Sequence, residues 1–297
     1  MADPRLLPVN AVLALHLGGG TWPRALADAG YAVHQLEFPV GDVVVDVVSF
    51  AHAHEHVVLF ECKSGANVEP VQAKGYASIG IGDIRRVMTM PATATHGIAY
   101  VCLEEHEVRI RMGLPAGAGL LVVGPTRVRL QPGSTRLPSL DLVVSGPPPT
   151  IIALDHESPV AEYRDPVVAQ LAAAAARGEQ LVSTRSLAER ITVQYRSYGR
   201  SAREAMRKRA EEALRALLGA NGDLSAYFRI EKGEQHDGLV VRVLKTPLLA
   251  DPRGATQQWQ AMQRAARGGR RKKPTVPQGQ LDLWALAKDL EPEEGEE

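Results

Sequence analysis

Short runs of β-branched residues dominate the first half of the chain, whereas apolar residues at helical spacing dominate the second half. Val43 to Phe50 is one β-branched run, and Val57 to Phe60 is another. Such runs are typical of strands. The polar stretch AHAHEH between them suits a turn, and we therefore predict a hairpin here.

The pattern predicts further elements on both sides of this hairpin. A glycine triplet, Gly18 to Gly20, ends a first helix, and Thr21 caps a second, short one. The predicted helices cover residues 9–17, 22–29 and 68–82. The predicted strands cover residues 32–38, 98–103, 119–123 and 127–130. The segment 106–112 fits either a helix or a strand. Turn-rich sequence then closes a first domain, residues 1–145, and a proline-rich linker, residues 146–164, follows it.

A second domain, residues 165–248, is predicted to contain three helices and a hairpin. Its longest helix begins at a capping box of Ser201 and Glu204 and carries one apolar stripe. The other predicted elements are helices 165–177 and 183–191 and strands 227–230 and 239–244. This order resembles a winged-helix α+β domain, whose helix-turn-helix places one helix in a DNA major groove.

Basic side chains gather on this longest helix and just before it. The residues expected to contact DNA are Arg196, Arg200, Arg203, Arg207 and Lys208. Tyr195 and Tyr198 lie among them, and this mixture suits contact with backbone phosphates. A solvated helix face or a protein contact would also fit, and we prefer DNA as the partner.

Charged residues interrupt the two apolar strands of the hairpin. Asp46 lies in the first strand, and Glu61 and Lys63 end the second. Side chains alternate along a strand, so Glu61 and Lys63 share one face and Cys62 takes the other. If the strands pair antiparallel, Asp46 lies beside Glu61. Two neighbouring carboxylates repel each other unless a cation separates them, and their hard oxygens suit Mg²⁺ or Mn²⁺.

These residues resemble the PD-(D/E)xK nuclease superfamily. Gln72 and Tyr76 follow at a QxxxY spacing on the next predicted helix, similar to the RecB-like branch, and this spacing places both on one helix face. The resemblance covers roughly residues 20 to 130. It implies an α/β fold of the restriction-endonuclease type, with an αβββαβ core and a mixed sheet.

The resemblance also implies roles for individual residues. Asp46, Glu61 and the backbone carbonyl of Cys62 would hold one or two Mg²⁺ ions, and Lys63 would orient the attacking water. Gln72 would support the site or contact the DNA strand. Tyr76 would pack beneath it.

The chain also departs from the family pattern. Val45 stands where members carry proline, and Asp42 is a second candidate for the first acid. The glutamate that many members carry on the first helix is not evident, with Asp28 and Glu37 as weak substitutes. A structural role for Asp46, with Glu61 and Lys63 as a surface ion pair, is the competing interpretation.

The C-terminal tail, residues 249–297, differs in composition from both domains and is expected to be disordered. A basic, glycine-broken run, Arg264 to Lys273, is able to contact nucleic acid non-specifically. The sequence QLDLW resembles the short peptide by which bacterial replication and repair proteins bind the sliding clamp. Its residues would be Gln280, Leu281, Leu283 and Trp284. A short amphipathic helix folding back on the body would fit equally well.

Composition adds little to this picture. The 297 residues are 45% hydrophobic and 23% charged with a formal net charge of zero, which is ordinary for a soluble globular protein.

Cys62 and Cys102 fall in predicted core strands and are interpreted as free thiols of a reducing compartment. No signal peptide or membrane span is visible, so we expect a cytoplasmic protein. Three histidines in AHAHEH allow a zinc site, but a solvated turn is preferred.

The sequence as a whole predicts a Mg²⁺-dependent deoxyribonuclease of DNA repair, restriction or defence. A non-catalytic DNA-binding adaptor with a decayed nuclease fold is one alternative. An effector nuclease activated by a partner is another. Neither the DNA form nor the oligomeric state follows from the residues.

Overall fold

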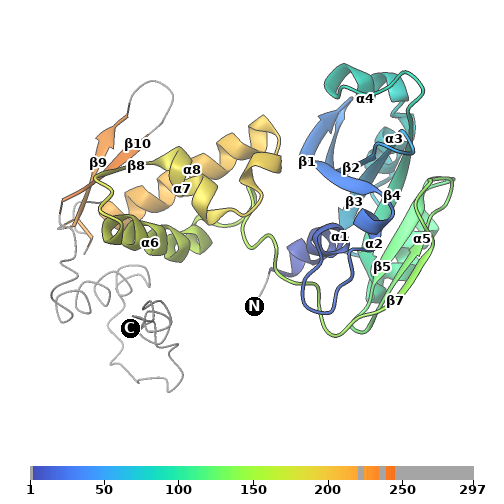
Figure 1. Ribbon diagram of the computed structural model, residues 1–297, viewed down its shortest axis with the longest axis horizontal. Coiled ribbons are helices and arrows are strands. Elements are labelled where there is room, and N and C mark those ends of the chain that lie inside the picture. Colours follow the sequence, from blue (N-terminus) through green and yellow to red (C-terminus); the bar gives the residue numbers. More distant parts are fainter. Residues whose placement is uncertain (1–2, 220–223, 226, 234–238, 245–297) are drawn as a thin grey trace, which may run out of the picture.

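The computed structural model describes residues 3–244 apart from 220–223, 226 and 234–238, and its two lobes are shown in Figure 1. The N-terminal lobe is an α/β structure on a seven-stranded mixed sheet. The second lobe combines helices with a three-stranded sheet. The predicted α/β class with a mixed sheet is therefore confirmed.

In the N-terminal lobe the strands lie side by side in their order along the chain. The strands are β1 (Tyr31–Val40), β2 (Val43–Ala51), β3 (His56–Lys63), β4 (Thr95–Leu103), β5 (Gly119–Val123), β6 (Arg127–Gln131) and β7 (Leu140–Val143). The helices are η1 (Pro4–Leu6), α1 (Leu7–Leu17), α2 (Ala25–Asp28), α3 (Pro70–Ser78), α4 (Ile81–Val87), η2 (Glu104–His106) and α5 (Glu107–Gly113). Strands β3, β4 and β5 run parallel, and the other neighbours pair antiparallel.

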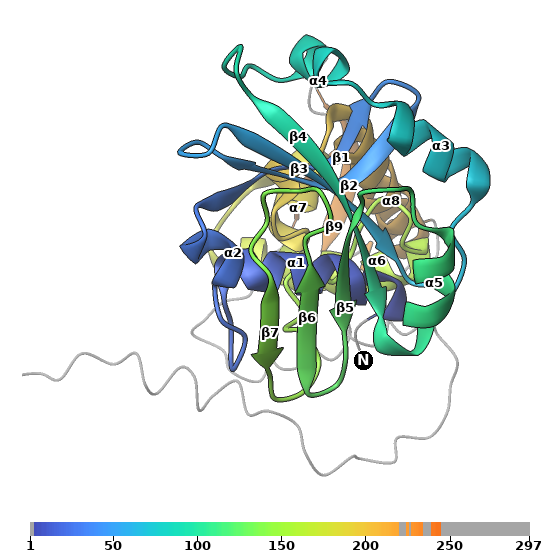
Figure 2. The ribbon, with the colours of Figure 1, turned by 90° about the vertical axis from the view of Figure 1, so that its right-hand side faces the viewer.

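The two faces of this sheet are covered by different helices (Figure 2). Val47, Val58 and Phe60 belong to the core that contains α1. Val48 and Leu59, their neighbours in sequence, pack instead with residues of α3 and α4. This alternation follows from the period of two along a strand. It continues to the end of β3, so the side chain that follows Phe60 lies on the α3 face.

The second lobe has its own apolar core, formed mainly by its helices. Its elements are α6 (Val160–Ala176), β8 (Leu181–Ser183), α7 (Thr184–Ile191), η3 (Tyr195–Ser197), α8 (Arg200–Leu218), β9 (Phe228–Lys232) and β10 (Leu239–Val243). The sheet order is β8-β10-β9, and both pairs are antiparallel. The expected helices and hairpin are present, and β8 is added to them.

The second lobe contacts β1, which is the edge strand of the large sheet. The Gly199 N–H donates to the Leu36 carbonyl over 2.9 Å, and Leu36 forms an isolated bridge with Tyr198. Tyr198 and Met206 are buried in the same apolar cluster as α1. The start of α8 is therefore attached to the N-terminal lobe by both backbone and side-chain contacts.

Replacing Gly199 with alanine is expected to lower the free energy of unfolding by about 1–3 kcal/mol, because an added methyl group overpacks this contact. A Cβ at Gly199 would lie 2.5 Å from the Glu37 carbonyl oxygen, which is backbone and has little freedom to move. Denaturant titration measures the loss. Gly82→Ala is the matched control, since a Cβ there meets nothing within 4 Å. Equal stability of the two variants would contradict the tight contact.

Several predicted element boundaries in the N-terminal lobe were wrong. The helix expected over 22–29 is reduced to α2, because the Thr21 hydroxyl donates to the Ser145 carbonyl over 3.1 Å and does not cap a helix. The motif helix expected over 68–82 is divided into α3 and α4 at Gly80. The ambiguous 106–112 segment is helical, and β7 lies in the stretch expected to hold only turns.

Boundaries in the second lobe also differ. Helix α6 begins at Val160 within the expected linker and contains Pro166, so it starts before Asp165, the predicted first residue of this helix. The N-cap of α8 is Gly199, and the predicted capping box is absent because Glu204 binds Arg207. The expected linker is also held to the first lobe, since the Asn10 side chain accepts from the backbone N–H of Ile152 over 2.7 Å.

The structure also bears on the cysteine and membrane expectations. Cys62 and Cys102 are both free thiols, as predicted. Across the described part of the chain, none of the helices is long and apolar enough to cross a membrane.

Candidate active site

Asp46 and Glu61 come from adjacent antiparallel strands at the point where their pairing ends. The last paired residues are Val47 and Phe60, so the next step in register brings Asp46 opposite Glu61. Beyond this point β3 continues beside β4 alone. The Asp46 Oδ2 atom accepts the Cys62 N–H over 2.6 Å, so a carboxylate takes the place of a backbone partner. This contact fixes the Asp46 carboxylate at the separating end of the two strands.

Glu61, Lys63 and Gln72 form a closed triangle of contacts on the α3 face. The Lys63 Nζ atom lies 2.7 Å from Glu61 Oε1 and also donates to Gln72 Oε1. The Gln72 amide in turn donates to Glu61 Oε1 over 2.7 Å. The lysine side chain is only 14% exposed, so the pair is largely shielded from solvent. The sequence prediction that these side chains converge agrees with this geometry.

Tyr76 lies one helical turn after Gln72 and is fully buried. Its hydroxyl contacts Glu61 Oε2 and the Val44 carbonyl, the latter over 3.0 Å. Tyr76 was expected only to pack beneath the site. It also fixes the orientation of the Glu61 carboxylate and joins α3 to β2, a role that the QxxxY spacing alone does not reveal.

The electrostatics of the site reflect two acids in a confined space. Burial raises the pKa of Asp46 well above its ordinary value, and the neighbouring Glu61 charge raises it further. The Cys62 N–H and Lys63 act in the opposite direction. Burial and the same carboxylates also raise the pKa of the Cys62 thiol, so this cysteine is not poised as a nucleophile. The single positive charge of Lys63 thus does not balance the two carboxylates of Asp46 and Glu61.

A divalent cation fits this donor set. Asp46, Glu61 and the Cys62 carbonyl offer hard oxygen atoms, and a cation would relieve the repulsion that raises the pKa of Asp46. A carboxylate has about four lone-pair positions, and the contacts to Glu61 use three of them. No group of three or more histidine, cysteine or acidic side chains suited to a metal ion occurs among the residues that the structure describes. The fit therefore rests on two carboxylates and a carbonyl.

Glu37 is a third acid near this site and was only a weak candidate from sequence. It lies in β1 with a φ of 49°, a left-handed conformation that is uncommon for a residue other than glycine. Burial raises its pKa to about 7, helped by the charges of Asp155, Glu157 and Glu61 and opposed by Arg5. Glu37 also raises the pKa of Asp46. No sequence motif marks it, because its position depends on the contact between the lobes.

Glu37→Gln is expected to remove a pH-dependent loss of stability. A carboxyl whose pKa rises on folding from 4.5 to about 7 favours the folded state at low pH and opposes it once ionised. The variant should match the parent near pH 4.5 and exceed it by about 1–3 kcal/mol at pH 8. Chemical unfolding at both pH values measures this. Glu105→Gln, at a 71% exposed side chain, is the control and should leave the pH dependence as it is. An unchanged slope in Glu37→Gln would contradict the assignment.

Other sequence candidates lie elsewhere. Asp42 is exposed in the turn between β1 and β2, not on the strand where it was predicted. His56 is a buried residue of β3 and not part of the turn, because its Nδ1 atom bonds the Thr95 hydroxyl over 2.8 Å. His52 and His54 are in the turn as predicted.

The predicted DNA contacts on α8 are of two kinds. Arg196, Arg200 and Lys208 are exposed, and Arg203 is half-buried. Arg207 is already engaged by Glu204 and Glu211 on its own helix and is held as an internal ion pair. The basic run Arg264 to Lys273 lies outside the described residues. The clamp-like residues Gln280, Leu281, Leu283 and Trp284 also lie outside them and stay a prediction from sequence.

Comparison with known proteins gives no relative. No family model matches the chain, and neither the curated proteins nor the solved structures contain a match. The function is therefore argued from the geometry of the site.

Proposed function

We propose that this protein is a Mg²⁺- or Mn²⁺-dependent deoxyribonuclease of the PD-(D/E)xK type. One observation carries the proposal: Asp46 and Glu61 meet where β2 and β3 separate, with Lys63 and Gln72 bonded to Glu61 on the same side. A structural ion pair between Glu61 and Lys63 needs neither the second acid, the half-buried Asp46, nor the glutamine. The order of α1, three antiparallel strands, α3 and β4 also supports this family.

Each residue has a separate task in phosphodiester hydrolysis. Asp46, Glu61 and the Cys62 carbonyl would hold the cation, which when bound supplies Lewis-acid stabilisation of the charge on the phosphate. Lys63 would orient the attacking water and balance developing negative charge. The Gln72 amide fixes the Lys63 amine and the Glu61 carboxylate next to each other, because it accepts a hydrogen bond from the first and donates one to the second. Tyr76 fixes the opposite oxygen of Glu61.

DNA is the proposed substrate because of the second lobe. Its order of α6, β8, α7, α8 and a final hairpin supports a winged-helix domain, in which α8 would face the DNA. The first three turns of α8 present the exposed side chains of Arg200 and Lys208. Lysine and arginine on such a helix contact backbone phosphates and position the protein without reading sequence.

The test is a panel of linear, nicked, flapped and single-stranded DNA incubated with the full-length protein. Cleavage of at least one form that depends on Mg²⁺ or Mn²⁺ and is stopped by a chelator is expected. DNA that is bound but not cut in any form with either ion would overturn the nuclease and favour a DNA-binding adaptor. RNA of matched sequence is the control for the preferred substrate.

A further inference from the structure

A recess in the second lobe is lined by four arginines. It lies between α7, η3 and the first two turns of α8 and has a volume of about 330 Å³. Its lining residues are Arg185, Tyr195, Arg200, Arg203, Glu204 and Arg207. A volume in this range lies at the small end of pockets that hold small molecules, about 300–1,000 Å³. We refer to it as the arginine pocket.

The arginine pocket contains more positive charge than its own acid balances. Glu204 is bound by Arg207, which also contacts Glu211. Among the described residues Arg200 and Arg203 form no ion pair, and Arg185 reaches Glu189 only at 3.7 Å. Two guanidinium groups, those of Arg200 and Arg203, therefore face the recess without an ion pair to any described residue, and the one carboxylate that lines it, Glu204, is already bound by Arg207. Guanidinium groups bind phosphate oxygens in a planar, two-pronged manner, so the missing counter-charge matches a phosphate group.

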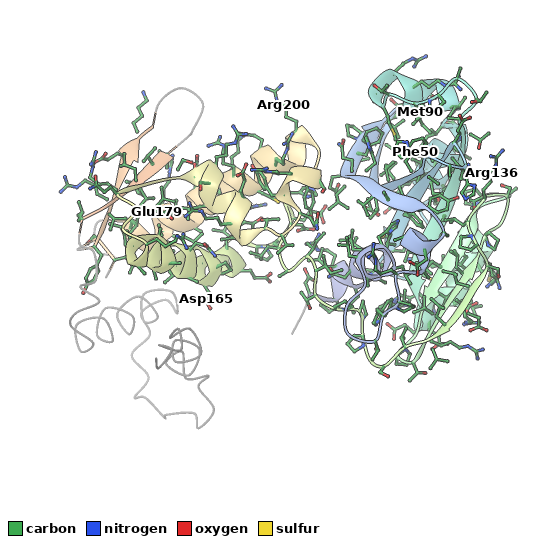
Figure 3. The ribbon with its side chains drawn as sticks, in the orientation of Figure 1. Phe50, Met90, Arg136, Asp165, Glu179 and Arg200 are labelled. Carbon is green, nitrogen blue, oxygen red and sulfur yellow. The ribbon has the colours of Figure 1, made fainter. Side chains whose placement is uncertain are left out.

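The arginine pocket is close to the contact between the lobes. Arg200 follows Gly199, whose N–H bonds the Leu36 carbonyl of β1. Figure 3 shows Arg200 at the end of α8 that faces the N-terminal lobe. The next residue of β1 is Glu37, whose pKa is raised by burial and by nearby acids that include Glu61. The arginine pocket therefore lies at the end of the second lobe that contacts the N-terminal lobe.

We propose that the arginine pocket binds the terminal phosphate of a DNA strand, a proposal that rests on DNA being the substrate. A terminal phosphomonoester carries about −1.5 to −2 charges at neutral pH, more than the single charge of each backbone diester. The two guanidinium groups of Arg200 and Arg203, which have no ion pair among the described residues, suit the higher charge. A recess admits a strand end, whereas backbone phosphates of a duplex are contacted along an open surface. The pocket thus distinguishes phosphorylated ends from hydroxyl ends.

The experiment measures binding separately from cleavage. Short DNA strands and duplexes of one sequence, with phosphate or hydroxyl groups at either end, are titrated against the full-length Lys63→Ala protein by fluorescence anisotropy. We expect phosphate at one of the two ends to raise affinity about tenfold, the effect of a single charge-assisted contact. The double variant Arg200→Gln and Arg203→Gln, in the same background, should lose this preference and still bind hydroxyl-ended DNA.

The control is Arg215→Gln, which removes one positive charge, against two in the double variant, from an exposed position in the last turn of α8. It should keep the preference for phosphate. Circular dichroism and thermal melting of all variants establish that they are folded. Equal affinity for phosphate and hydroxyl ends, or equal loss of preference in Arg215→Gln, would overturn the pocket proposal. The nuclease would stand in that case if the wild-type protein cuts DNA, whereas absence of any DNA binding would remove both.

Discussion

Replacing Lys63 with alanine is expected to lower the rate of metal-dependent DNA cleavage by about 10²–10⁴-fold, the usual contribution of a positioned proton-transfer or charge-stabilising group. The Nζ atom of Lys63 contacts both Glu61 and Gln72. Alanine removes it while leaving the strand intact. DNA affinity should be nearly unchanged, because Lys63 is largely shielded and the basic surface of α8 is untouched.

Single-turnover cleavage and DNA binding are measured on the same protein preparations. Lys74→Ala is the matched control, since Lys74 is an exposed residue of α3, the helix that carries Gln72. It removes the same charge near the site and should retain activity. Full cleavage by Lys63→Ala would show that the amine is structural. Parallel loss of cleavage and of binding would indicate that it contacts DNA in the ground state.

The part of the site that sequence could predict depends on short-range geometry. The period of two along β3 places Glu61 and Lys63 on one face whatever the rest of the chain does. The four-residue spacing on α3 does the same for Gln72 and Tyr76. Asp46 required one further assumption, antiparallel pairing of neighbouring strands, which the turn between them favours. These placements agree with the structure because each involves residues close in sequence.

The part that sequence could not predict depends on contacts between distant segments. Glu37 approaches the site because β1 pairs with β2 on one side and receives Gly199 on the other. Thr21 is a good capping residue in isolation, but the Ser145 carbonyl competes for its hydroxyl. The helix predicted to begin at residue 165 begins instead at Val160, within the expected linker. For Glu37 and Thr21, contacts between remote parts of the chain decide the local structure, which short-range propensity does not reveal.

Asp46→Asn is expected to abolish metal binding at the site while the protein stays folded. Asparagine keeps an oxygen that can accept the Cys62 N–H, so the connection between β2 and β3 survives. The substitution removes the Asp46 carboxyl, whose pKa is raised by burial and by the charge of Glu61. The variant without metal should therefore melt at a higher temperature than the parent, by about 2–4 °C for each kcal/mol of repulsion relieved.

The pH dependence of stability tests this interpretation of Asp46. A carboxyl with a raised pKa favours the folded state when protonated and opposes it when ionised. The advantage of Asp46→Asn should vanish below the ordinary pKa of 3.8 and grow as the pH rises above it. Thermal melting across this range measures the effect. A variant that is less stable than the parent at neutral pH would mean that the Asp46 charge is already balanced without a cation.

The response to metal completes the test. Added Mg²⁺ or Mn²⁺ should raise the melting temperature of the parent, because a ligand that binds only the folded state stabilises it. Asp46→Asn should lose this response together with cleavage, since its neutral amide is a poor substitute for a carboxylate at a divalent ion. Asp42→Asn changes an exposed acid in the adjacent turn and should keep both. If Asp46→Asn gained stability and retained its metal response, the ion would bind elsewhere; gained stability with a lost response places the cation between Asp46 and Glu61.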